Sequence, residues 1–357
     1  AWNNKGSSLA SLGRHEEALS CFEEAIRLDP EYSVAWYNKA IALGELERHE
    51  EAIACYEEAI KWDPEYSDAW YNKGSSLASL ERYEEAIACY EEVIRLDPEN
   101  SDAWYNKGIA LDELERYEEA IACYDEAIRL DPEDSAVWNG KGIALASLER
   151  YEEAIACYDE AIRLDPENSA PRGNKGMALD ELEKYAEAIA CYEEVIKGEP
   201  ENPKAWHNKG IALALLRKYE EAIACFDEAI KWEPEDSVVW DGKGLVLCEL
   251  EKYAEAIVCY DEAIRLDPEY SSSWRGKGIA LCELEKYAEA IQCCDEAIKW
   301  EPEHTDAWYN KALALGELER YEEALSCYDE AIKLYPEYLL ALYGKGNSLR
   351  KLGRDEE

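Results

Sequence analysis

The apolar positions between residues 101 and 134 form two helical series separated by a polar turn. Trp104, Leu111 and Leu114 recur at helical spacing and mark the apolar side of a first helix. A second series begins after the polar turn and consists of Ala120, Ile121, Tyr124, Ala127 and Ile128. Pro132 ends that series, because proline lacks an N–H donor and disfavours helix at the residue before it. The pattern predicts two antiparallel helices.

This stretch of 34 residues is repeated along the chain, and no copy carries an insertion or a deletion. The proline that closes each copy recurs at Pro30, Pro64, Pro98, Pro132, Pro166, Pro200, Pro234, Pro268, Pro302 and Pro336. Small residues recur where helices must approach closely: Gly or Ala at the Gly108 position, and Ala at the Ala120 position. A fixed period of this size predicts a solenoid, in which each repeat buries its apolar surface against its neighbours.

The repeat resembles the tetratricopeptide repeat family over the entire chain. The residues that carry the resemblance are Trp104, Gly108, Leu111, Ala120, Tyr124, Ala127 and Pro132. It implies an all-α fold, a right-handed superhelical solenoid of antiparallel helix pairs, with residues 1–357 forming one domain. Two positions depart from the family pattern. Lysine precedes the glycine in every copy, as at Lys107, and we expect its stem to lie on apolar surface with the charge reaching water. Glutamate replaces the usual glycine between the helices in most internal copies, as at Glu115, which implies a turn without positive φ or one that tolerates strain.

The formal net charge of -43 disfavours nucleic acid and anionic membrane surfaces as partners, since both are bound through cationic side chains. It favours a basic or neutral protein or peptide. Most of the Lys and Arg residues fall at the positions of Lys107, Arg116 and Arg129, where we expect i,i+4 pairs such as Asp125 with Arg129. The sequence contains no apolar run long enough to span a bilayer and no signal peptide, and we expect a cytoplasmic protein.

The thirteen cysteines do not form the pattern of a disulfide scaffold. Ten of them recur once per repeat at the Cys123 position, and equivalent residues on stacked helices should lie beyond disulfide reach. We interpret them as small apolar packing residues in a reducing compartment. No C-x-x-C spacing occurs, so the sequence predicts no metal site and no cofactor.

Both ends of the chain fall inside a repeat. Trp2 already belongs to a first helix, and a second helix is expected to begin at 355–357. This pattern predicts a truncated solenoid whose exposed ends could associate head to tail. Repeat six is irregular, with Arg172 in place of the tryptophan and Gly198 near its end, so we predict a softer junction over residues 168–204.

A Tyr-Asn pair recurs on the first helices of several repeats. The family resemblance places the first helices on the concave face of the superhelix, where asparagine side chains can bind the backbone of a peptide. An asparagine offers both a donor and an acceptor, and the adjacent tyrosine adds contact area. With nearby acidic residues that would attract a basic partner, the predicted peptide-binding residues are Tyr37, Asn38, Tyr71, Asn72, Tyr105, Asn106, Asp112, Glu113, Tyr309 and Asn310. The alternative is that the asparagines only bond within their own repeats.

No motif for catalysis is present: the four histidines are scattered, and there is no glycine-rich phosphate loop and no Ser-His-Asp arrangement. The sequence therefore favours a non-enzymatic protein-interaction scaffold that binds an extended or helical peptide in its groove. Two alternatives stay open. The chain could be a structural spacer or self-assembling rod without a groove ligand, or the repeat arm of a larger enzyme or signalling protein.

Overall fold

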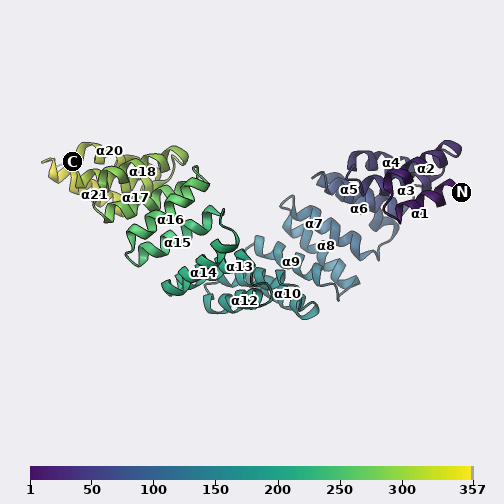
Figure 1. Cartoon of the computed structure of the whole chain (residues 1–357), viewed down its shortest axis with the longest axis horizontal. Coiled ribbons are helices and arrows are strands. Elements are labelled where there is room, and N and C mark those ends of the chain that lie inside the picture. The colour runs from purple at the N-terminus through teal and green to yellow at the C-terminus, as the bar shows by residue number, and fades with distance from the viewer. Residues whose placement is uncertain (355–357) are drawn as a thin grey trace. The chain divides into compact units, whose positions relative to one another are not determined.

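The computed structural model describes residues 1–354, and in this part of the chain every regular element is an α-helix (Figure 1). The predicted helix pairs are confirmed: α7 (Ser101–Asp112) and α8 (Tyr117–Leu130) cover the stretch from which the repeat was defined. The first helices of the repeats are α1 (Trp2–Ala10), α3 (Ser33–Gly44), α5 (Ser67–Ala78), α7, α9 (Ser135–Ser147), α11 (Ala170–Glu181), α13 (Pro203–Leu215), α15 (Ser237–Glu249), α17 (Ser271–Glu283), α19 (Thr305–Glu317) and α21 (Leu339–Lys351). The second helices are α2 (His15–Leu28), α4 (His49–Trp62), α6 (Tyr83–Leu96), α8, α10 (Tyr151–Leu164), α12 (Tyr185–Gly198), α14 (Tyr219–Trp232), α16 (Tyr253–Leu266), α18 (Tyr287–Trp300) and α20 (Tyr321–Leu334).

The helices form two compact units. The first unit, residues 1–182, contains α1 to α11, and the second begins at Glu183 and contains α12 to α21. Within each unit, every helix packs against the helix that precedes it and the helix that follows it, and many first helices also contact the next first helix. The division lies between the two helices of repeat six. The predicted softer junction over 168–204 stays a prediction, and the second helix expected at 355–357 lies outside the described residues.

The turn between the two helices of a repeat uses a left-handed residue. Glu115 has φ 57°, and the N–H groups of Glu115 and Arg116 donate to the carbonyl oxygens of Asp112 and Leu111. Of the two alternatives for a glutamate in this turn, the strained one is therefore correct. The non-glycine residues with positive φ among residues 1–354 are Glu47, Glu81, Glu115, Glu149, Glu183, Arg217, Glu251, Glu285 and Glu319.

A buried aromatic ring joins the two helices of each described pair except that of repeat nine, which has Cys294 at this position. Tyr124 of α8 is 1% exposed and lies directly against Gly108 of α7, where a Cβ would meet the ring at 2.6 Å. The glycine is thus needed for close approach of the helices rather than for a special backbone angle. The same ring also lies against Gly140 of α9, so a single side chain packs against two successive first helices.

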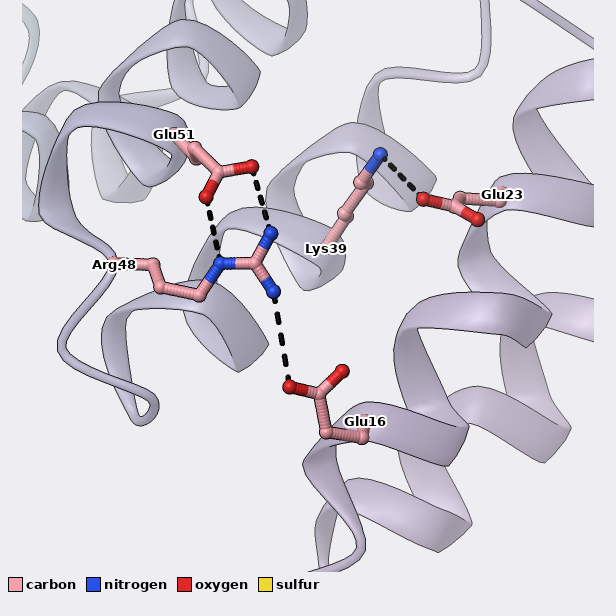
Figure 2. A network of polar contacts seen from close by, with 5 residues as sticks. All are labelled: Glu16, Glu23, Lys39, Arg48 and Glu51. Carbon is pink, nitrogen blue, oxygen red and sulfur yellow. Dashed lines mark hydrogen bonds and ion pairs between the residues drawn. The ribbon is translucent and has the colours of Figure 1, made fainter.

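Charged side chains connect neighbouring repeats on the outside of this core. Arg48 binds Glu51 of its own repeat at 2.6 Å and Glu16 of the preceding repeat at 3.8 Å, while Lys39 binds Glu23 of α2 at 3.1 Å (Figure 2). The lysine ammonium is therefore paired with a carboxylate rather than only reaching water. Each such surface pair contributes less than about 1 kcal/mol, but the network is repeated along each unit.

The predicted i,i+4 pair between Asp125 and Arg129 is wrong. Arg129 binds Glu126, three residues before it, at 2.8 Å, and Asp125 binds Lys141 of the next repeat at 2.5 Å. Spacing on one helix therefore predicted a local pair, whereas packing of the next first helix brings a competing lysine to Asp125. The thirteen cysteines all lie within residues 1–354 and none of them is part of a disulfide, as predicted for the recurring cysteines.

Candidate functional site

The predicted Tyr-Asn pairs lie side by side along the first helices of the first unit. Asn72 on α5 donates through Nδ2 to the hydroxyl of Tyr37 on α3 at 3.0 Å. One repeat further, Asn106 on α7 donates to the hydroxyl of Tyr71 at 2.8 Å and also to the carbonyl oxygen of Asp102. Each of these hydrogen bonds therefore connects one repeat to the next. The sequence did not predict this arrangement, because the two possibilities considered for the asparagines were peptide binding and bonds within their own repeats.

These bonds use the donor side of the amides. Among residues 1–354 no donor to the Oδ1 atoms of Asn72 and Asn106 is found, so both oxygens can still accept a hydrogen bond. Burial raises the pKa of Tyr37 and Tyr71 above its ordinary value, so both hydroxyls remain protonated. Asn38 makes a similar bond to Oδ1 of Asn3 at 3.0 Å. This ladder of Asn38, Asn72 and Asn106 therefore mainly connects stacked repeats. The oxygens of Asn72 and Asn106 can still accept hydrogen bonds.

The two acidic residues predicted near this ladder have different environments. Asp112 is largely buried and accepts a hydrogen bond from the Tyr124 hydroxyl at 2.5 Å, while its other oxygen, Oδ1, is buried without a partner. Glu113 is exposed and follows the end of α7. Burial raises the pKa of Asp112 from its ordinary value to about 6. Asp112 is therefore engaged in the core of its repeat, and only Glu113 presents an exposed carboxylate.

We expect the substitution Asp112→Asn to stabilise the protein at neutral pH. The pKa of Asp112 is higher in the folded chain, about 6, than its ordinary value of 3.8. The stability that this group contributes is therefore present below pH 3.8 and is lost as the pH rises through about 6. Asparagine keeps an acceptor for Tyr124 but carries no charge. Guanidinium unfolding should show no gain near pH 4 and a gain on the order of 1 kcal/mol at pH 7, after allowance for partial exposure.

The adjacent exposed residue provides the control for this substitution. Glu113→Gln removes the same charge without removing a buried carboxylate, and its effect on the free energy of unfolding should be small at both pH values. An equal gain from Glu113→Gln at pH 7 would attribute the effect to the overall negative charge and not to burial.

The corresponding face of the second unit carries exposed apolar side chains. Ile211, Leu245 and Leu313 occupy the same repeat position on α13, α15 and α19 and are 39%, 54% and 40% exposed. This position was not among the predicted binding residues. The signal was present, because an apolar residue recurs there in every copy from repeat four to repeat ten, in addition to the apolar residues that form the core.

Tyr309 and Asn310, the remaining predicted residues, line two pockets on this face. Tyr309 borders a pocket of about 430 Å³ together with Leu340 and Tyr343 of α21, which are 56% and 69% exposed. Asn310 borders a second pocket, of about 390 Å³, that lies between α17 and α19. Leu313 and Glu317 line both pockets. Tyr309 and Asn310 therefore line surface pockets, in contrast to the hydrogen-bonded ladder of Asn38, Asn72 and Asn106.

Exposed carboxylates run beside the apolar positions. Glu249, Glu283 and Glu317 occupy equivalent positions in the last turns of α15, α17 and α19. The Tyr219 hydroxyl donates to Glu249 at 3.1 Å. In residues 1–354 none of the three carboxylates forms an ion pair, in contrast to many carboxylates of the second helices, such as Glu91, Glu126, Asp227 and Asp295, which bind Lys or Arg.

A metal cluster or a membrane-spanning helix would indicate another kind of function. No group of three or more His, Cys, Asp or Glu side chains in residues 1–354 is placed to hold a metal ion. Each helix of the described chain is too short or too polar to cross a membrane.

Comparisons with solved structures show the fold. The Cut9-Hcn1 hetero-tetramer of the APC/C aligns over 98% of this chain and 75% of its own, with 16% identity and a TM-score of 0.56. YrrB, described as a TPR protein with an unusual peptide-binding site, aligns over 53% of this chain and 97% of its own, with 25% identity and a TM-score of 0.45. Yeast Tom70 aligns over 99% of this chain and 96% of its own, with 15% identity and a TM-score of 0.47. No curated protein sequence matches the chain.

Comparison with family models gives the assignment. Tetratricopeptide repeat models match residues 1–64, 37–101, 71–134, 105–169, 174–236, 276–304 and 305–338, and a TPR repeat model matches residues 244–284. The matches cover most of the chain and agree with the helix pairs and the aromatic core described above. The chain belongs to the tetratricopeptide repeat family.

Proposed function

We propose that this protein is an interaction scaffold whose first-helix face binds a basic peptide segment with apolar side chains. The observation that supports this most directly is the combination found on α15, α17 and α19. Exposed Leu245 and Leu313 lie beside a row of carboxylates that have no cationic partner within residues 1–354. An apolar stripe bordered by unpaired charge of one sign is suited to an amphipathic partner of the opposite sign.

The first unit offers a complementary set of contacts. The oxygens of Asn72 and Asn106 can accept hydrogen bonds from peptide N–H groups, and Glu113 adds an exposed carboxylate. Each neutral hydrogen bond is worth about 1 kcal/mol net, so a few such bonds with modest apolar burial support micromolar affinity. The acidic composition favours the same class of partner, because a net charge of -43 attracts basic segments and repels acidic ones.

The test begins with a peptide ligand of known sequence. Random twelve-residue peptides displayed on phage are selected against the intact chain, and the best binder is synthesised and titrated by fluorescence anisotropy. We expect it to contain Lys or Arg with apolar residues, and we expect its affinity to fall as salt is raised. Failure to select any peptide that binds more tightly than about 1 mM would favour the structural rod instead.

We expect the substitution Leu245→Ser to weaken binding of this peptide about tenfold. Removing a leucine from a contact costs roughly 1.5 kcal/mol, which corresponds to about a tenfold change in Kd. The fold should tolerate serine, since Ser75 occupies the equivalent position on α5. The control is Val258→Ser on the second helix α16, because Val258 is 60% exposed and Leu245 is 54% exposed.

The two variants separate the proposal from its main alternative. A loss of affinity confined to Leu245→Ser supports binding on the first-helix face. Equal affinity for both variants, with helicity unchanged by circular dichroism, would contradict the proposed face. A change in self-association by either variant would instead favour a self-assembling rod.

A further inference from the structure

The pocket between α17 and α19 has an apolar floor and an acidic rim. Its volume is about 390 Å³, and Ile279, Cys282 and Leu313 line its apolar part. The rim carries three carboxylates: Glu283 at the end of α17, Glu285 in the following turn and Glu317 at the end of α19. Asn310 adds an amide to the same wall. The pocket therefore combines apolar side chains and carboxylates in one lining.

The negative charge of the rim is not balanced by this chain. Within residues 1–354 no Lys or Arg forms an ion pair with Glu283, Glu285 or Glu317. The lysines of α17 and α19 are engaged elsewhere, since Lys277 binds Asp261 and Lys311 binds Asp295, both at 2.6 Å. Lys351 lines the adjoining pocket together with Glu317 but forms no ion pair with it within residues 1–354. Burial first, and then the nearby Glu283, raise the pKa of the Tyr253 hydroxyl above its ordinary value.

The surroundings of Tyr287 support this picture independently. Burial first, and then the nearby Glu317, Glu285 and Cys282, raise the pKa of the Tyr287 hydroxyl above its ordinary value. The Tyr287 hydroxyl therefore lies close enough to the rim carboxylates for their negative charge to affect it.

The core of repeat nine has a smaller side chain than the cores of the other repeats. Tyr or Phe fills the buried position of Tyr124 in the other repeats, whereas repeat nine has Cys294, which is 0% exposed. In repeat eight the Tyr260 hydroxyl lies 3.8 Å from the sulfur of Cys248, the residue equivalent to Cys282. Repeat nine has no such hydroxyl for Cys282, which lines the pocket. Cys294 itself does not line the pocket, and the neighbouring pocket of about 430 Å³ has the equivalent tyrosine, Tyr328, in its wall.

We propose that this pocket binds a cationic side chain of the partner segment, with arginine the best fit. The stem of an arginine would cover Ile279 and Leu313, and its guanidinium would lie among Glu283, Glu285 and Glu317. Arginine suits three separate carboxylates because its planar group has five donors and is weakly hydrated. The inference rests on the proposed function, because it names the side chain that the first-helix face selects.

The first experiment uses a small probe, N-acetyl-arginine-N-methylamide, and the intact protein labelled with 13C in Ile and Leu methyl groups. We expect saturable shifts of the Ile279 and Leu313 methyl signals. N-acetyl-citrulline-N-methylamide has almost the same shape without the charge, and we expect it to cause no shift at equal concentration. Equal shifts with both compounds would overturn the proposal.

Paired charge variants locate the site. The double variant Glu283→Gln, Glu317→Gln should weaken binding of the arginine probe about tenfold, the change expected from losing two partly exposed charge contacts. The matched control is Glu255→Gln, Glu289→Gln, which removes two exposed carboxylates from the first turns of α16 and α18. Equal weakening by both variants would show that general negative charge, and not this pocket, attracts the probe.

The outcomes distinguish this inference from the proposed function. If the selected peptide is weakened by Leu245→Ser but the arginine probe does not bind, the face is correct and the pocket assignment is wrong. If the probe binds in the pocket but no peptide is selected, the pocket assignment stands and the peptide scaffold is wrong.

Discussion

Replacing Tyr158 with alanine should destabilise the first unit by about 3–5 kcal/mol, the largest effect we expect from a single substitution. Tyr158 of α10 is 2% exposed, and its ring lies against Gly142 of α9, where a Cβ would meet it at 2.5 Å. Alanine would leave a void at the contact between the two helices of one repeat. The neighbouring backbones cannot easily close that void, since both are fixed by adjacent repeats.

The matched control for this substitution occurs in the chain itself. Phe22 and Phe226 occupy the equivalent position in repeats one and seven and are each 1% exposed. Tyr158→Phe should therefore change the free energy of unfolding by less than about 1 kcal/mol. A similar loss of stability in both variants would show that the hydroxyl, and not the ring, supports the pair.

The measurement for Tyr158→Ala should resolve position along the chain. Solenoids unfold in local segments, so one global free energy is a poor description of the effect. Hydrogen–deuterium exchange should show faster exchange in α9 and α10, whereas α15 and α16 of the second unit serve as internal references. Exchange that rises equally in all four helices would contradict local destabilisation.

Replacing three strained turn residues with glycine should stabilise the first unit by about 2 kcal/mol in total. Glu81, Glu115 and Glu149 have φ of 58°, 57° and 59°, a region that costs a residue with a Cβ roughly 1–2 kcal/mol. Glycine removes that cost but makes the unfolded chain more flexible, so the net gain should be about 0.5–1 kcal/mol per site. Thermal and guanidinium unfolding of the triple variant measure the sum.

A triple variant with glutamine at the same positions separates strain from charge. Glutamine removes the same three negative charges but keeps a Cβ in the left-handed region, so it should give little of the gain. Gly13 and Gly353 show that the turn accepts glycine, with φ of 72° and 71°. If the glutamine variant is stabilised as much as the glycine variant, relief of charge repulsion accounts for the effect.

Most of the local structure could be predicted from the sequence. The apolar series of residues 101–134 predicted α7 and α8, and the recurring small residues predicted a close helix contact, which the ring of Tyr124 against Gly108 confirms. The free cysteines were also predicted correctly. These features depend on spacing within one repeat, and a fixed period of 34 residues reports that spacing directly.

The candidate site was predicted only in part, because its contacts join different repeats. Asn72 and Asn106 were identified as polar groups of the first-helix face, but their bonds to Tyr37 and Tyr71 depend on the offset between stacked helices. The expected pair of Asp125 with Arg129 failed for the same reason. A side chain with several possible partners binds the one that lies closest. The distance between side chains of different repeats cannot be calculated from the spacing of residues along one helix.

The sequence by itself determined the all-α repeat architecture, the positions of the helices and the acidic character of the protein, because these follow from local periodicity and composition. Only the tertiary structure decided that Asp112 is largely buried, that the turn glutamates take positive φ, and that carboxylates gather around a pocket between α17 and α19. Burial, backbone strain and a shared cavity arise when separate helices pack together. These properties depend on contacts between packed helices, so the sequence of one repeat does not determine them.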